Sequence, residues 1–197
     1  MRKLHTPAKI QDFLNTMPFN FETLGDTCKS PRRVLAERKA QCMEGAMFAA
    51  TALRLLGHPP LVVDLESTDD DHDHVIAVFK VRGRWGAISK TNHAVLRYRE
   101  PIYASVRELV MSYFHEYFLK DGRKTMRAFS RPVNLARFDG QNWMTSEEPV
   151  WFVPEHLCDI PHQAILKTKD VVALRKADDV EISAGEIVEW RKPKRSC

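Results

Sequence analysis

The sequence predicts an α+β fold in which an apolar helix packs on an antiparallel β-sheet. Three segments support this. A largely buried helix is expected to begin at Cys42 and to end at Gly57, where a Gly-His-Pro-Pro run stops it. Residues 61–65 have the composition of a strand, and residues 74–89 that of a β-hairpin with its turn at Arg82-Gly83. A helix followed by antiparallel strands is typical of an α+β layer arrangement.

Two shorter helices are expected before this core. Thr6-Pro7 supplies a cap and a first-turn proline, and apolar residues at helical spacing follow. Ser30-Pro31 repeats the signal, so a second helix should start there and break before Cys42.

A further helix is expected beyond the hairpin. Ser105 and Glu108 form a capping box, and an apolar stripe from Val106 to Phe118 predicts a helix that ends near Gly122. Its aromatic residues are interpreted as a core face. After about residue 125 the periodic signal weakens. There we predict strands at Trp143, 151–153 and 187–190, and a short helix at 171–177.

Composition indicates a soluble globular protein. The chain has 197 residues, of which 44% are hydrophobic and 28% charged, and this length suits one domain. No secretory signal follows the N-terminus, and no segment approaches the roughly 18 apolar residues of a membrane span. We therefore expect a cytoplasmic protein without a membrane partner.

Charge and cysteine usage exclude other classes. The net charge is +4, and much of the excess lies in the basic run 191–195, which we interpret as a solvated tail and not as a nucleic-acid contact. The four cysteines are far apart and form no Cys-x-x-Cys pair. Reduced thiols are expected, without a zinc site or a disulfide scaffold.

Cys42 is the first candidate for chemistry. A thiol at a helix N-terminus faces the positive end of the helix dipole, which lowers its pKa, and the backbone amides there can stabilise an oxyanion. The alternative is an inert buried cysteine that packs with Ala46 and Met47. His74, 32 residues later at the start of a strand, is the matching base, because nucleophile and base are adjacent in space but separated in sequence.

Two blocks of sequence resemble the transglutaminase-like superfamily. The match covers about residues 38–92, and its blocks are CMEGA at 42–46 leading to ALRLLGHP at 52–59, and HVIAVF at 74–79 followed by GRW at 83–85 and Ile88. The resemblance implies a papain-like fold with a Cys-bearing helix, a His strand and an Asp strand. It also implies one domain over residues 1–197, with a core of about 30–120 and a C-terminal extension of about 125–197.

The chain departs from the family pattern at the third position. Where the resemblance implies an Asp that orients the imidazole, the sequence has Ser89. A hydroxyl provides a neutral hydrogen bond, about half as strong as one to a carboxylate. Asn92 is the second candidate, because papain-like proteases use Asn to orient the histidine.

The acidic segment 69–74 could hold a divalent ion, but adjacent residues of an extended segment point to opposite sides. We interpret it as a solvated loop in which Asp73 or His72 could instead assist the site, and expect neither metal nor cofactor. His93 and His162 receive no function.

The sequence thus predicts a cysteine-dependent acyl hydrolase or transferase, of peptidase, amidase or transglutaminase type. It would act through a Cys42 thioester with His74 as base and Ser89 or Asn92 as orienting residue. The substrate would be a peptide, a protein or a small amide or ester. The alternative is an inactive fold that binds a peptide or protein, supported by the missing Asp.

Overall fold

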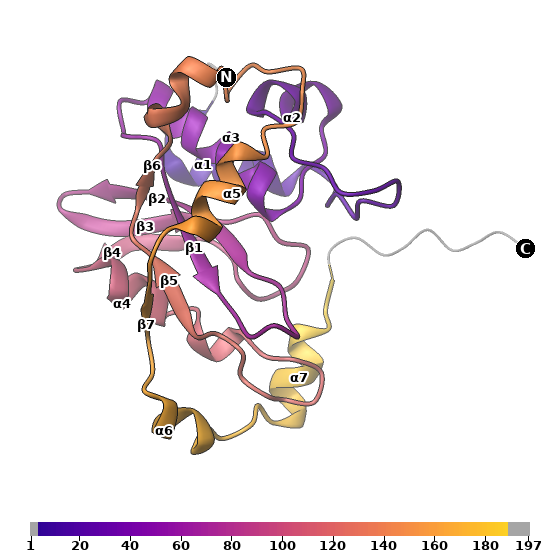
Figure 1. Cartoon of the computed structure of the whole chain (residues 1–197), viewed down its shortest axis with the longest axis vertical. Helices are drawn as coiled ribbons and strands as arrows, with labels where there is room; N and C mark the ends of the chain where they lie inside the picture. The colour runs from indigo at the N-terminus through magenta and orange to yellow at the C-terminus, as the bar shows by residue number, and fades with distance from the viewer. Residues whose placement is uncertain (1–3, 189–197) are drawn as a thin grey trace, which may run out of the picture.

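The protein is built on one antiparallel sheet, described over residues 4–188 of a computed structural model (Figure 1). The strand order is β4-β3-β2-β1-β5-β7, and β6 also pairs with β1. The strands are β1 (Leu61–Glu66), β2 (His74–Val81), β3 (Arg84–Ile88), β4 (Arg99–Tyr103), β5 (Ala128–Ser130), β6 (Val133–Asn134) and β7 (His162–Ala164). Together with the helices, this sheet confirms the α+β class.

The helices begin at the expected caps. Three helices precede the first strand: α1 (Pro7–Asn15), α2 (Pro31–Glu37) and α3 (Cys42–Leu55). Between β4 and β7 lie α4 (Val106–Met111), the 3-10 turns η1 (Phe114–Glu116) and η2 (Leu135–Gln141), and α5 (Phe152–Asp159); α6 (Thr168–Val172) and α7 (Asp179–Gly185) follow β7. The Thr6 side chain accepts a hydrogen bond from the N–H of Lys9, and Ser30 accepts one from Arg33. The first three helices and the β2–β3 hairpin confirm the sequence predictions.

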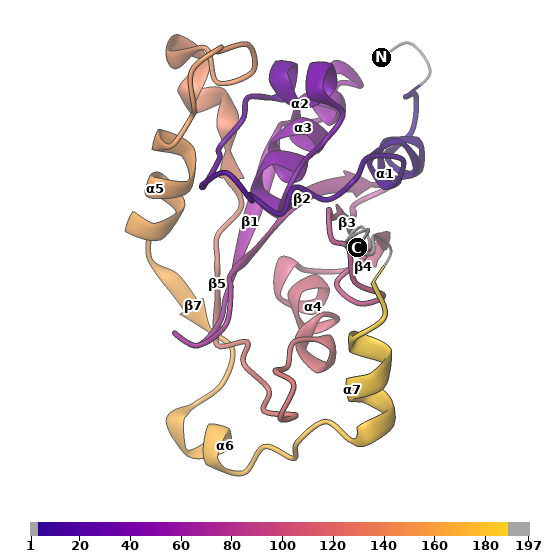
Figure 2. The same ribbon diagram turned by 90° about the vertical axis from the view of Figure 1, so that its right-hand side faces the viewer.

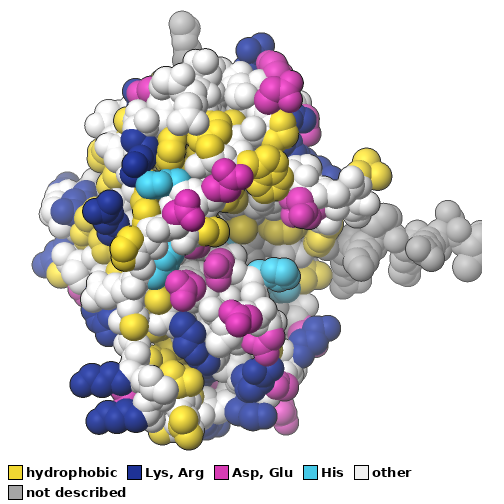
Figure 3. Space-filling model, viewed as in Figure 1, with side chains coloured by type: hydrophobic (Ala, Val, Ile, Leu, Met, Phe, Trp, Pro, Cys, Tyr) yellow, Lys and Arg dark blue, Asp and Glu magenta, His cyan; other side chains and the backbone are white. Residues whose placement is uncertain are grey.

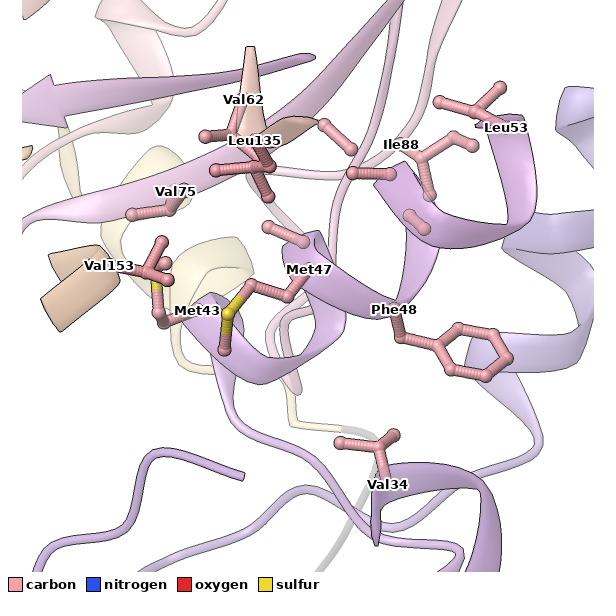
Figure 4. Packing of buried hydrophobic residues seen from close by; sticks show 14 of the residues in the cluster. Val34, Met43, Met47, Phe48, Leu53, Val62, Val75, Ile88, Leu135 and Val153 are labelled. Carbon is pink, nitrogen blue, oxygen red and sulfur yellow. The ribbon is translucent and has the colours of Figure 1, made fainter. Parts of the chain in front are cut away.

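Each face of the sheet has its own apolar core. Val62 and Val75 point to the face that α3 covers, and Met47 of α3 belongs to the same buried cluster (Figure 4). Val63 and Ile76, which alternate with them, pack on the other face with residues of α4. Figure 2 shows the two helices apart from each other, with α3 above α4 in that view. This alternation follows from the two-residue period of a strand.

Gly45 lets α3 approach the segment that follows β3. A Cβ atom at this position would lie 2.3 Å from Cβ of Lys90. Any side chain here would push apart the helix that begins at Cys42 and the segment that begins at Ser89. The glycine therefore sets the spacing between two parts of the candidate site.

The helix predicted over 106–118 is wrong in length. It ends at Met111, and only the short turn η1 follows. The guanidinium of Arg99 donates to both the hydroxyl and the carbonyl of Ser112, and Glu116 forms an ion pair with Arg99 at 2.7 Å. These tertiary bonds replace the next helical turn. The aromatic residues Tyr113 and Tyr117 are buried, as expected.

The predictions for the C-terminal part also need correction. Residues 151–153 open α5 instead of forming a strand, since Val153 and Leu157 are buried one helical turn apart. Trp143 is buried in a turn, where its indole donates to Asp139. The predicted helix 171–177 overlaps only the end of α6.

The extension nevertheless contributes to the sheet through β5, β6 and β7. Of the strand predicted at 187–190, Val188 forms a single antiparallel bridge with His93, and the remainder lies outside the described residues together with the basic run 191–195 and Cys197. No helix within residues 4–188 has the length and apolar character needed to cross a membrane.

Candidate functional site

Cys42 is the first residue of α3. Gln41 caps the helix by accepting from the N–H of Met43, and the Glu44 side chain accepts from the N–H of Gln41 at 3.0 Å. The carboxylate of Glu44 is completely buried and also accepts from the Thr27 hydroxyl and the Lys29 N–H. One acidic side chain thus fixes both the first turn of the helix and the loop in front of it.

Cys42 and His74 line the same cavity, which has a volume of about 1010 Å³. It lies at the end of the sheet where β1 finishes and β2 begins, because Asp64 and Val75 are paired residues that both line it. Helices α5 and α7 complete the wall through Leu157 and Ile182, among others. Figure 3 shows the hollowed face with acidic and histidine side chains grouped around it.

His74 is held by Ser89. Its Nε2 atom lies 2.8 Å from Oγ of Ser89, whose hydroxyl donates to the carbonyl oxygen of Leu96. Because a carbonyl can only accept, Ser89 must accept from Nε2–H, which assigns the neutral tautomer. The Nδ1 atom has no hydrogen-bond partner among the described residues, so it is the basic atom available to the cavity.

Ser89 is itself fixed from α1. The side chain of Gln11 accepts from the N–H of Ser89 at 2.9 Å and donates to its carbonyl at 2.8 Å. Asn92, the second candidate for orienting His74, is buried and lines the cavity, but among the described residues its side chain makes no hydrogen bond to His74. Of the two candidates, only Ser89 contacts the imidazole.

Burial keeps the thiol and the imidazole neutral. It raises the pKa of Cys42 to about 11, against hydrogen bonds from the backbone of Val75 and Met43 that lower it, while the charge of Asp64 raises it further. Burial also lowers the pKa of His74 to about 4, with a smaller contribution from His93. The Met43 N–H at the helix N-terminus lowers the thiol pKa as expected, but desolvation is the larger effect and the net shift is upward.

Asp64 also lines the cavity and is bonded to His162, two residues for which the sequence predicts no function. Asp64 is 4% exposed, and its Oδ2 atom lies 3.1 Å from Nε2 of His162. Burial, followed by the charge of Asp73, raises the pKa of Asp64 to about 6. A carboxylate in the middle of the apolar segment 61–65 was a signal that could have identified the residue.

The acidic loop is mostly committed to local bonds. Asp73 accepts from the N–H and hydroxyl of Ser67, and Asp71 accepts from Thr125. The hydroxyl of Tyr117, another residue of the wall, donates to the carbonyl of His72. Within residues 4–188, no group of three or more His, Cys, Asp or Glu side chains is arranged to hold a metal ion.

No protein-family model and no curated protein matches this chain. Cys42 and His74 line the cavity, and Ser89 is hydrogen-bonded to His74.

Proposed function

We propose that the protein is a cysteine-dependent acyl hydrolase, of peptidase or amidase type, with a papain-like, transglutaminase-like fold. One observation carries the proposal: Cys42 and His74 line one cavity, while Ser89 engages Nε2 of His74 and leaves Nδ1 available as a base. The order of a Cys helix, a His strand and an orienting residue supports the same fold.

In the proposed reaction, the sulfur of Cys42 attacks the carbonyl carbon of an amide or ester as Nδ1 of His74 removes the thiol proton. The resulting tetrahedral adduct collapses to a thioester, and the leaving amine or alcohol takes that proton from Nδ1–H. A water molecule then attacks the thioester while Nδ1 accepts its proton, and this proton returns to the departing sulfur. The reaction starts from the neutral pair that the raised thiol pKa and the lowered imidazole pKa favour.

Ser89 limits how strongly the imidazolium is stabilised. Its hydroxyl orients the ring but carries no charge, so the imidazolium formed during attack lacks the carboxylate partner that the resemblance implies. We therefore propose slow turnover.

Cys28, Cys42 and Cys158 are free thiols, which supports a reducing compartment such as the cytoplasm.

The same observation favours a second candidate function, an inactive fold that binds a peptide or protein in the cavity. Without a charged partner, His74 would remain neutral and Cys42 would remain a thiol. The two proposals differ in whether an acyl group is ever transferred to sulfur.

The deciding experiment traps the thioester. We would incubate the protein with p-nitrophenyl acetate and locate the acetyl group by peptide mass mapping. Acylation of Cys42 that disappears in Cys42→Ala and is slowed in His74→Ala supports the hydrolase. Cys158 is the internal control, because it is an exposed thiol of the same chain. Acylation of Cys158 without acylation of Cys42 would leave only the binding function.

A further inference from the structure

Asp64 lines the cavity that contains Cys42 and has a carboxylate oxygen without a hydrogen-bond partner in the described part of the chain. His162 bonds only to Oδ2, and Oδ1 is buried without a hydrogen-bond partner among residues 4–188. Its side chain is only 6% exposed, yet the residue lines the cavity. Since a buried acceptor without a partner costs about 1–3 kcal/mol, such groups generally have a ligand or a functional use.

The surroundings of Asp64 disfavour its negative charge unless a cation is present. Desolvation raises its pKa to about 6, and the charges of Asp73 and Glu66 raise it further, against the opposing effect of His162. A bound cation beside Oδ1 would supply the missing hydrogen bond and offset the neighbouring negative charge.

The rest of the cavity wall is predominantly acidic. Five further carboxylates line it: Glu22, Asp71, Asp73, Glu116 and Glu186. The cationic residues of the wall are Lys90 and Lys120, and the ammonium of Lys90 donates to the carbonyls of Leu14 and Met17. A cavity lined by one sign of charge concentrates ligands of the opposite sign.

The structure also relates Asp64 to the thiol. Asp64 pairs across the sheet with Val75, whose backbone hydrogen bonds to the sulfur of Cys42. The charge of Asp64 is one of the effects that act on this thiol. Asp64 is thus one strand pairing away from the residue whose backbone bonds to the sulfur.

We propose that Asp64 is a substrate-binding residue that receives an ammonium or guanidinium group of the acyl substrate in the cavity beside Cys42. This inference rests on the proposed function and names its substrate class: a peptide or small amide that carries a cationic group near the bond to be cleaved. His162 is the positioning residue that holds the Asp64 carboxylate through Oδ2.

The test compares two thiol reagents of opposite charge, trimethylammonioethyl methanethiosulfonate and sulfonatoethyl methanethiosulfonate. Their rates at Cys42 are measured by mass mapping in wild type, Asp64→Asn and Asp69→Asn. The Asp69 variant removes the same charge from a residue that does not line the cavity. We expect the cation-to-anion rate ratio to fall about tenfold in Asp64→Asn, the effect of one unit charge a few ångströms away, and to stay unchanged in Asp69→Asn.

A neutral reagent separates a charge effect from a structural one. Because the charge of Asp64 raises the thiol pKa, iodoacetamide should modify Cys42 faster in Asp64→Asn than in wild type. General disruption of the cavity would instead change all three rates in the same direction. An unchanged ratio in a folded Asp64→Asn protein overturns the proposal.

A second measurement uses wild type alone and does not depend on the thiol. The melting temperature is recorded with N-benzoylarginine amide and with the isosteric neutral N-benzoylcitrulline amide. A larger upward shift with the arginine compound supports the cation site, and equal shifts contradict it. If Cys42 resists every reagent while the arginine preference persists, the cation site stands and the hydrolase proposal fails.

Discussion

Replacing Glu44 by Gln should destabilise the protein by about 3 kcal/mol, because this buried carboxylate connects the Cys42 helix to the loop before it. One carboxylate oxygen accepts from the N–H of Gln41, and the other accepts from the Thr27 hydroxyl and the Lys29 N–H. The amide of Gln has a single acceptor oxygen, so one of these two sets would face an NH₂ group. A buried donor left without an acceptor costs about 1–3 kcal/mol.

The charge adds to this cost. The side chain of Lys29 is 4% exposed, and its ammonium nitrogen lies 3.9 Å from a carboxylate oxygen of Glu44 and 3.0 Å from one of Glu37. Glu37 provides the matched control, since it contacts the same ammonium but its side chain is 42% exposed. Glu37→Gln should cost at most about 1 kcal/mol, as expected for a solvent-exposed ion pair.

Urea unfolding followed by circular dichroism measures both variants. The expected result is a lower midpoint in Glu44→Gln, with the slope unchanged, and a much smaller shift in Glu37→Gln. Equal losses in the two variants would refute the reasoning that burial makes the Glu44 bonds the stronger ones.

Three further predictions concern packing, pH dependence and the orienting residue. Gly45→Ala should lower the free energy of unfolding by about 1–3 kcal/mol although alanine favours helices, because the new Cβ atom meets Lys90. Gly140→Ala is the control: its Cβ atom would have nothing within 4 Å, so it should cost little in the same urea assay. The pKa of His74 is about 4 folded against 6.5 unfolded, so its neutral form contributes about 3 kcal/mol of stability above pH 6.5 that is lost as the pH falls to 4. The raised pKa of Asp64, about 6 against 3.8, acts in the opposite direction and removes stability as the pH rises from 4 to 6. Because the two effects are of similar size and opposite sign, wild type should show little pH dependence between pH 4 and 6.5. Thermal melts should show stability that falls with rising pH in His74→Gln and increases with rising pH in Asp64→Asn, and identical profiles in all three proteins would contradict these assignments. Ser89→Ala should slow acylation of Cys42 by p-nitrophenyl acetate by roughly tenfold, the effect of about one hydrogen bond. Ser89→Asn keeps an acceptor for His74 and a donor for Leu96, so it should retain most of the rate. Equal rates in wild type and Ser89→Ala would exclude Ser89 as the orienting residue.

The elements with strong local signals were predictable from sequence. Thr6-Pro7 and Ser30-Pro31 begin α1 and α2 as predicted, because the cap and the fixed proline dihedral act within a few residues. The position of Cys42 at a helix start and of His74 at a strand start follows from the same local rules.

The elements that depend on distant partners were not predictable. The aromatic stripe after Met111 has helical spacing, but Arg99 of strand β4 donates hydrogen bonds to the hydroxyl and carbonyl oxygens of Ser112, and the helix ends there. The strands β5 to β7 are only two or three residues long: β5 and β6 form because β1 offers an edge that β2 leaves free, and β7 pairs with β5. Their sequences carry no periodicity that could be recognised.

The candidate site shows the same division. Sequence order suggested Cys42, His74 and Ser89, but burial set the direction of the pKa shifts of Cys42 and His74, and burial depends on the whole fold. Asp64 and His162 are 98 residues apart and meet only because β7 joins the sheet through β5. No spacing rule could have connected them.

The central claim, that His74 removes the proton of Cys42, is tested most directly by the pH dependence of Cys42 alkylation. With iodoacetamide in wild type, we predict a rate that is flat between about pH 5 and pH 9, because the neutral pair persists between the pKa of about 4 for the imidazole and about 11 for the thiol. In His74→Ala only the thiolate reacts, so the rate should be lower at pH 7 and rise about tenfold per pH unit. A wild-type rate that rises in the same way as that of His74→Ala would contradict the claim.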